Sequence, residues 1–291
     1  MSFYRLPITD NLTVMFKRIT IIGLGLIGGS LALAIKKKGL ARKVIGVSRR
    51  RSTIRKAISK GLVDSATLDL SRGVKDSDLI ILTAPVLKII DITKKILPFL
   101  KEGAVITDAG STKSDIIGKI EGFSLGESFF VGSHPLAGSE KSGLEYADKD
   151  LFQDAYCILT KTKTTNLKAL ARLKKFWKAI GMKVEVMTPQ RHDKVLSRLS
   201  HLPHAVSVSL SNLADKESLH LAAGGFKDTT RIAAGSPELW KDIFVTNRGN
   251  LVKDIKAFKR ELFKIESALK SNDVTTLLRL FERAKKIRDS I

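Results

Sequence analysis

The chain has 291 residues, 43% of them hydrophobic, which is enough for two domains and a sizeable core. Its single cysteine, Cys157, excludes an internal disulfide framework, and no stretch approaches the ~20 apolar residues of a membrane span. Lys and Arg number 51 against 29 Asp and Glu, a formal net charge of +22, but aromatic residues are only 6% and form no stripe with the basic ones. We therefore expect a basic surface that attracts anionic small molecules, with no nucleic-acid partner.

Residues 1–16 are expected to be an irregular leader, and because the first eleven lack the pattern of a signal peptide we expect a cytoplasmic protein with no membrane partner. Strands and helices then alternate. Strands are predicted at 18–22, 44–47, 78–83, 104–107 and 129–131, and helices at 30–38, 53–60 and 89–100. This alternation predicts an α/β fold with a Rossmann-type, doubly wound parallel sheet over residues 17–180.

The pattern changes after Thr160. A helix is predicted at 166–180 and a strand at 183–187, and from Pro189 onward only helical periodicity remains. Long helices are predicted at 242–270 and 274–291. We therefore expect an all-helical C-terminal domain over residues 181–291.

The segment Gly23-Leu24-Gly25-Leu26-Ile27-Gly28 follows the first buried strand and opens the first helix. In that context a Gly-x-Gly-x-x-Gly loop predicts a dinucleotide site, because Gly23 permits a tight turn, Gly25 lets the backbone approach the pyrophosphate and Gly28 lets helix and strand pack closely. Free amides at the helix start would bind the phosphates. Further cofactor contacts are expected from Leu26, Ile27, Ala84, Pro85 and Asp108.

The acidic residue that would bind the ribose of NAD about 20 positions later is missing, since no Asp or Glu occurs between Asp10 and Asp64. The second strand is followed instead by Ser48, Arg49 and Arg50. Arginines there can pair with a 2′-phosphate, which favours NADP over NAD, although a solvated basic turn would have the same sequence.

Polar side chains also follow two later strands. Ser111 comes after strand 104–107, and His134 comes after strand 129–131. Ligands of open α/β sheets bind outside the carboxyl ends of the strands, and a histidine there can act as a general base. The alternative roles are a helix N-cap for Ser111 and a hydrogen-bonded turn residue for His134. No Cys/His spacing predicts a metal site.

Together the motifs resemble the prephenate/arogenate dehydrogenase family of tyrosine biosynthesis, over residues 16–250. The matching segments are Gly-x-Gly-Leu-Ile-Gly-Gly-Ser at 23–30, Asp-x-Gly-Ser at 108–111, His-Pro-x-Ala-Gly at 134–138, Ser-His-Leu-Pro-His at 200–204 and Gly-Gly-Phe-Lys-Asp-Thr-Thr-Arg-Ile-Ala at 224–233. The resemblance implies oxidative decarboxylation of prephenate to 4-hydroxyphenylpyruvate with hydride transfer to NAD(P), and a homodimer formed through the helical half. Arogenate is the alternative substrate.

The same resemblance implies roles for single residues. His134 takes the proton of the ring hydroxyl, and Ser111 hydrogen-bonds to it. Arg231 binds a substrate carboxylate and His204 contacts the substrate side chain. Further substrate contacts are expected from His201, Ser139, Glu140 and Lys227. A structural or surface role is the alternative for His201, Glu140 and Lys227, and Trp240 is either an aromatic near the site entrance or a core residue.

Two other functions are compatible with a dinucleotide fold. One is a hydroxy-acid dehydrogenase with a catalytic lysine, against which the His134 and His204 segments argue. The other is a redox sensor that binds NADP without turnover, which would not need Ser111, His134 and Arg231 together. The residues do not agree on the choice between prephenate and arogenate. His204 can donate a hydrogen bond to a keto acid and so favours prephenate, whereas a preference for NADP favours arogenate by family analogy.

Overall fold

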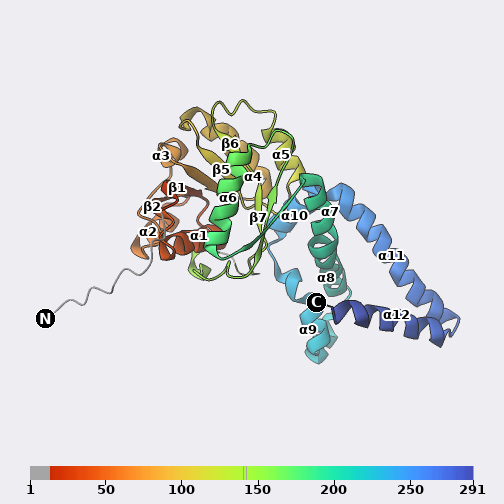
Figure 1. The fold of residues 1–291 in the computed structure, drawn as a ribbon. Helices are drawn as coiled ribbons and strands as arrows, with labels where there is room; N and C mark the ends of the chain where they lie inside the picture. The colour runs from red at the N-terminus through yellow and green to blue at the C-terminus, as the bar shows by residue number, and fades with distance from the viewer. Residues whose placement is uncertain (1–13, 140, 142, 291) are drawn as a thin grey trace.

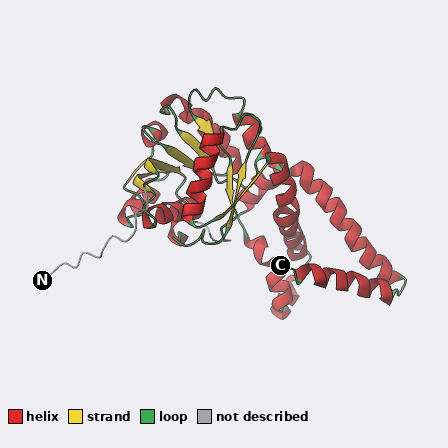
Figure 2. Cartoon of the chain, in the orientation of Figure 1, coloured by secondary structure: helices red, strands yellow, loops and turns green. Residues whose placement is uncertain are grey.

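The computed structural model describes residues 14–139, 141 and 143–290, so the expected leader lies almost wholly outside it (Figure 1). The first half of the chain forms a sheet covered by helices. The second half is helical and projects to one side of it (Figure 2).

A six-stranded parallel sheet with the order β3-β2-β1-β4-β5-β6 forms the centre of the first half. This order places the carboxyl ends of β1 and β4 side by side, at the point where the strand order reverses and where such sheets bind dinucleotides. The predicted doubly wound fold is therefore confirmed. Its strands are β1 (Phe16–Ile22), β2 (Ala41–Val47), β3 (Ser65–Thr67), β4 (Leu79–Leu82), β5 (Val105–Asp108) and β6 (Phe129–Phe130).

Helices cover both faces of this sheet, and the central strand β4 is accordingly apolar at every position. In β4 the side chains of Leu79 and Ile81 enter one core cluster, and those of Ile80 and Leu82 enter the other. The helices of this half are α1 (Leu26–Lys37), α2 (Arg51–Ser59), α3 (Leu70–Val74), α4 (Val86–Ile96), α5 (Ser114–Ile120) and α6 (Leu167–Ile180). α1 starts four residues before the predicted Ser30, directly after Gly25.

A second, three-stranded sheet was not predicted. It contains β7 (Ser133–Pro135), β8 (Tyr156–Thr160) and β9 (Lys183–Met187), with β7 antiparallel and β9 parallel to β8. Trp177 of α6 fixes it to the first half, because the indole N–H donates to the Ser133 hydroxyl at 3.1 Å. β9 pairs with β8 over five residues, so the expected division after residue 180 falls between α6 and a strand of this sheet.

The helical half begins at Pro189. The helix predicted over 242–270 is wrong as one element, because the chain breaks at Asn247, whose φ of −113° and ψ of 21° leave the helical region. Its helices are α7 (Pro189–Leu196), a π-helical turn η3 (Ser197–His201), α8 (Leu202–Asn212), α9 (Gly224–Thr230), α10 (Pro237–Thr246), α11 (Arg248–Lys270) and α12 (Val274–Arg288). None of the described helices is long and apolar enough to cross a membrane.

Candidate active site

The glycine loop joins β1 to α1 at the switch point of the large sheet. Gly23 has a φ of +105°, and a Cβ on Gly28 would lie 1.9 Å from the Gly23 carbonyl oxygen, so neither position tolerates a side chain. A Cβ on Gly25 would meet no atom within 4 Å. No side chain caps the first turn of α1, which leaves its amides available. The loop is therefore closed around Gly23 and Gly28 and open at Gly25, which fits a bound pyrophosphate.

Thr83, at the end of β4, holds this loop. Its hydroxyl donates to the carbonyl oxygens of Ile22 at 3.1 Å and Gly23 at 2.5 Å. Ala84 and Pro85 follow it directly, and Pro85 is the N-cap of α4. The predicted cofactor residues of β1 and β4 are therefore adjacent in space.

The predicted ribose segment lies at the end of β2. Ser48 is half-buried and its hydroxyl accepts a hydrogen bond from the amide of Arg50 at 3.3 Å, while Arg49 and Arg50 are exposed. Arg50 is the N-cap of α2, whose first turn has neither a side-chain cap nor an acidic residue. The arginine side chains and the free amides therefore lie together at the start of α2, where they could bind an anionic group such as a phosphate.

A cavity of about 520 Å³ separates the small sheet from the helical half. Ser111 and His134 lie in its wall together, as the sequence predicts. Other wall residues come from β8, β9, α7, η3 and α10, and include Tyr156, Ile158, Glu185, Met187, Leu196, Ser200, Leu239, Trp240 and Ile243. Its volume suits a small organic ligand.

His134 does not make the predicted hydrogen bond to Ser111. Its Nδ1 lies 2.8 Å from Nε2 of His192, and Nδ1 of His192 lies 2.8 Å from Oδ1 of Asp193. Burial, followed by the charges of His192, Lys113 and His201, lowers the pKa of His134 well below 6.5. A buried, neutral imidazole with one nitrogen engaged is suited to accept a proton at the other.

His192 and Asp193 were not among the site residues predicted from the sequence. They lie about 60 residues after His134, in the first helix of the other half. The one available signal was a polar His-Asp pair on the buried face of a short amphipathic helix, where an apolar side chain is the usual choice.

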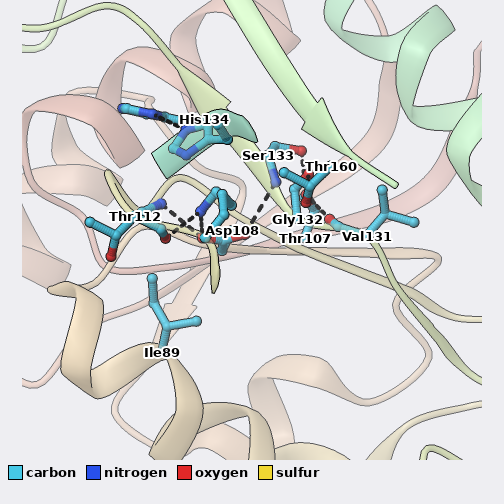
Figure 3. A network of polar contacts seen from close by, with 12 residues as sticks. Ile89, Thr107, Asp108, Thr112, Val131, Gly132, Ser133, His134 and Thr160 are labelled. Atoms are coloured by element: carbon cyan, nitrogen blue, oxygen red, sulfur yellow. Dashed lines mark hydrogen bonds and ion pairs between the residues drawn. The ribbon is translucent and has the colours of Figure 1, made fainter. Parts of the chain in front are cut away.

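Asp108 is placed differently from the expectation of a cofactor contact. Its carboxylate is fully buried and pairs with the equally buried Lys113 ammonium. It also accepts from the amides of Gly110 at 2.9 Å and Ser133 at 3.2 Å. Figure 3 shows His134 lying next to this network around Asp108 and Ser133. With its oxygens engaged inside the protein, Asp108 stabilises the loop that carries Ser111.

Ser111 is not the N-cap of α5, because the cap position is Lys113. The structure thus removes that alternative and leaves the half-buried Ser111 side chain facing the cavity.

The two histidines of segment 200–204 differ in their surroundings. His201 is 1% exposed and its Nδ1 accepts from the Asn247 side chain at 3.1 Å, which places it behind the cavity wall and fits the structural alternative. His204 stacks on Trp240, with ring centroids 3.5 Å apart and planes at 8°. Nδ1 of His204 is buried and has no hydrogen-bond partner. A ligand group that hydrogen-bonds to this Nδ1 would offset the free-energy cost of burying it unpaired.

The other predicted substrate residues lie on exposed segments. Ser139 accepts from the amide of Lys141 at 3.1 Å, Lys227 lies on α9, and Arg231 starts the short helical turn η5 (Arg231–Ala234). Glu140 lies outside the described residues. Trp240 is half-buried in the cavity wall, which fits an aromatic at the site. Within the described part of the chain, no group of three or more His, Cys, Asp or Glu side chains is arranged to hold a metal ion.

Comparison with known proteins agrees with this geometry. Residues 31–186 match the family model described as prephenate dehydrogenase, nucleotide-binding domain, and residues 188–283 match prephenate dehydrogenase, dimerization domain. The chain is 37% identical over 283 residues to a prephenate dehydrogenase of Lactococcus lactis subsp. cremoris, covering 94% of this chain and 77% of the relative.

Solved structures extend the agreement to the whole fold. A prephenate dehydrogenase from A. aeolicus, in complex with hydroxyphenyl propionate and NAD+, has 35% identity and a TM-score of 0.86, with 94% of this chain and 98% of that chain covered. The arogenate dehydrogenase of Synechocystis has 33% identity and a TM-score of 0.81, covering 94% and 99%. The chain therefore belongs to the prephenate dehydrogenase family of NAD(P)-dependent oxidoreductases.

Proposed function

We propose that this protein is a prephenate dehydrogenase, which converts prephenate to 4-hydroxyphenylpyruvate and CO2 with hydride transfer to NADP. The observation that carries the proposal is the placement of Ser111 and His134 in one cavity, at the carboxyl side of a dinucleotide-binding sheet. The L. lactis relative supports the same substrate.

The nicotinamide cofactor supplies the hydride acceptor. We propose that Gly23, Gly25, Leu26, Ile27 and Gly28 hold its pyrophosphate. The NADP preference is supported by the missing acidic residue after β2 and by Ser48, Arg49 and Arg50 at the start of α2.

His134 is the proposed base. As the ring hydroxyl becomes a carbonyl, its proton passes to the free nitrogen of His134, and Ser111 orients the hydroxyl from the same cavity wall. Loss of the ring carboxylate is driven by aromatisation, so the protein has only to bind, orient and deprotonate.

Cations and polar groups of the helical half are proposed to bind the dianionic substrate. Arg231 pairs with a carboxylate, and the unpaired Nδ1 of His204 meets the side chain of the substrate. Ser139, Glu140 and Lys227 are further proposed contacts, and Trp240 closes the cavity over the ring.

A four-way assay tests the proposal, with prephenate or arogenate as substrate and NAD or NADP as cofactor. We expect kcat/KM with prephenate and NADP to be the highest of the four, and at least about tenfold above prephenate with NAD, since losing a bidentate phosphate contact costs about 1.4 kcal/mol or more. Equal values for the two cofactors would refute the NADP assignment. Absence of turnover in all four combinations, with cofactor bound, would favour a redox sensor.

Arogenate is the second candidate, and one acidic residue in the cavity wall favours it. His134 pairs with Ile158, and Ile158 pairs with Glu185, so the three lie in one row across the small sheet. Two strand spacings put Glu185 about 10 Å from His134 along that row. A carboxylate there would attract the ammonium of arogenate and repel the keto acid of prephenate.

The Glu185→Gln variant separates these two substrates. If arogenate is bound with its ammonium towards β9, the substitution raises KM for arogenate about tenfold and leaves that for prephenate equal or lower. Glu185 is exposed, so stability should change little. Equal effects on both Michaelis constants would mean that the substrate side chain does not lie on this row.

We further propose that the protein acts as a homodimer in the cytoplasm, with neither nucleic acid nor membrane as a partner. The dimerization-domain match supports the assembly, and the buried free thiol of Cys157 fits a reducing compartment. We also propose the domain division after residue 180, at the end of α6.

A further inference from the structure

We infer that Asp193 and His192 are positioning residues that fix which nitrogen of His134 is free to take the proton. The inference deepens the proposed function and rests on it, because it concerns the base of the same site. It assigns roles to two residues of the helical half that no motif indicated.

The Asp193 carboxylate can only accept hydrogen bonds. Its Oδ1 receives the amide of Lys113 at 2.8 Å, and its Oδ2 receives the amide of Ser114 at 2.9 Å. Burial by itself raises the pKa of Asp193, but hydrogen bonds from His192, Ser114 and Lys113 more than offset it, so the pKa is lowered and the group is ionised. Backbone amides cannot reverse their direction, so this orientation is fixed.

An ionised Asp193 determines the tautomer of His192. Nδ1 of His192 lies 2.8 Å from Oδ1 of Asp193 and must carry the hydrogen of that bond. Burial lowers the pKa of His192, which keeps the ring neutral at pH 7 and leaves its Nε2 with a lone pair.

The same constraint then passes to His134. Nε2 of His192 is an acceptor, so Nδ1 of His134, 2.8 Å away, must be the donor. Neutral His134 therefore has its lone pair on Nε2. A fixed order of donors and acceptors, from Asp193 through His192, thus leaves the nitrogen of His134 that is not bonded to His192 free to act as the base.

Other charged groups face these rings without taking part in the chain of hydrogen bonds. The Lys113 ammonium is bound to the Asp108 carboxylate and the Thr112 carbonyl oxygen, and Nδ1 of His201 is bound by Asn247. Lys113 and His201 lower the pKa of His134, after burial and His192. They make the ring a weaker base but do not select between its nitrogens.

The arrangement also provides a place for the positive charge. When the substrate O–H bond breaks, an N–H bond forms at Nε2 of His134 and the ring becomes an imidazolium. Its Nδ1 proton then moves to Nε2 of His192, so one N–H bond breaks and one forms. His134 returns to neutral, and the charge lies on His192, beside the Asp193 carboxylate.

The base is assembled across the junction of the two halves. His134 lies on β7, whereas His192 and Asp193 lie on α7, and the amides that hold Asp193 belong to the segment that carries Ser111. Asn247 adds a second anchor, since its side-chain amide donates to the Asp193 carbonyl oxygen at 2.8 Å.

The decisive variant is Asp193→Ala. Oδ1 of Asp193 accepts from both Nδ1 of His192 and the amide of Lys113, so an asparagine could keep both bonds through its own oxygen, whereas alanine removes the acceptor. Without the carboxylate, Nδ1 of His192 is no longer required to carry the hydrogen, and His134 can carry its own hydrogen on Nε2, where the base is needed. We expect kcat to fall about 100-fold or more, with KM for prephenate and the Kd of NADP changing less than about threefold.

The direct measurement is the ¹⁵N spectrum of histidine-labelled protein without substrate, where only five histidines contribute. We expect His134 to be protonated at Nδ1 in the wild type and to divide its hydrogen between Nδ1 and Nε2 in Asp193→Ala. Asp254→Ala is the matched control, since Asp254 is a buried carboxylate that binds Arg198 away from the cavity, and it should change neither kcat nor the His134 signals.

A second pair of variants tests the same chain of hydrogen bonds in case Asp193→Ala does not fold. His192→Gln retains a carbonyl oxygen that can accept from His134, whereas His192→Leu does not, so Gln should keep at least about tenfold more activity than Leu. Wild-type His134 protonated at Nε2, or an unchanged tautomer in Asp193→Ala, would overturn the inference. The spectrum is recorded without substrate, so it tests the tautomer of His134 even if the proposed substrate is wrong.

Discussion

At the scale of single residues, the site depends on side chains held in unusual protonation states. Burial lowers the pKa of His201 to about 4, and it also lowers the pKa of His134, His192 and His204. Each of these rings binds a proton more weakly in the native protein than in the unfolded chain, so the cluster that serves catalysis also lowers the free energy of unfolding at mild acidity.

The His201 shift predicts how stability depends on pH. Between pH 6.5 and about 4 the unfolded chain binds a proton at His201 that the native protein does not, so the free energy of unfolding falls as pH falls through that interval. The difference corresponds to about 3 kcal/mol from this residue. His201→Gln, which keeps an acceptor for Asn247, should flatten urea-unfolding stability between pH 7 and 5 relative to wild type. The same substitution at the exposed His220 is the control, and a slope unchanged in His201→Gln would contradict the assignment.

At the scale of elements, the β1–α1 junction combines a structural glycine with a functional one. A Cβ at Gly28 meets the Gly23 carbonyl oxygen at 1.9 Å, whereas one at Gly25 meets nothing within 4 Å. The first position sets the packing of helix against strand, and the second leaves room for a ligand.

The two alanine variants should therefore behave differently. Gly28→Ala is expected to lower the free energy of unfolding by at least about 1–3 kcal/mol through overpacking, and thermal unfolding without cofactor would measure this loss. Gly25→Ala should keep stability to within about 1 kcal/mol but weaken NADP binding at least about tenfold in a fluorescence titration. Unchanged NADP affinity in Gly25→Ala would show that the pyrophosphate does not approach this residue.

At the scale of the whole molecule, the last two helices bury little of their apolar surface within one chain. α11 has only three buried residues along 23 positions, and α12 has none among its described residues. Phe263 and Phe281 are 62% and 57% exposed. Apolar faces of this extent mark interaction surfaces, and Figure 1 shows α11 projecting away from the sheet and α12 turning back from its far end.

We therefore expect Phe263→Glu and Phe281→Glu to convert the dimer to monomer, because burying a carboxylate in an apolar interface is costly. Sedimentation velocity at micromolar concentration would measure the change. Lys175→Glu on the exposed face of α6 also introduces a carboxylate and should leave the dimer intact. A monomeric wild type, or dimers that persist in both variants, would contradict the proposed interface.

The sequence by itself determined the features that depend on neighbouring residues: the parallel sheet, the glycine loop and the two polar residues that follow strands. Apolar runs that alternate with helical patterns specified the parallel sheet, since strands buried on both faces need nearly continuous apolar sequence. The Gly23–Gly28 loop specified the dinucleotide site, because positive φ and close approach allow only glycine there. Ser111 and His134 followed from their places after strands, at an edge where parallel strands bring their ends together.

Only the tertiary structure decided which polar groups meet. His134 and His192 are 58 positions apart, and Asn247 reaches Asp193 across 54 positions, so no periodicity relates them. The Asp108 carboxylate, expected to contact the cofactor, pairs out of solvent with Lys113, five positions away. The chain breaks between α10 and α11 at Asn247, whose side chain bonds to His201 across the core. A hydrogen bond between buried groups depends on their distance and desolvation in the folded chain, and the local sequence determines neither quantity.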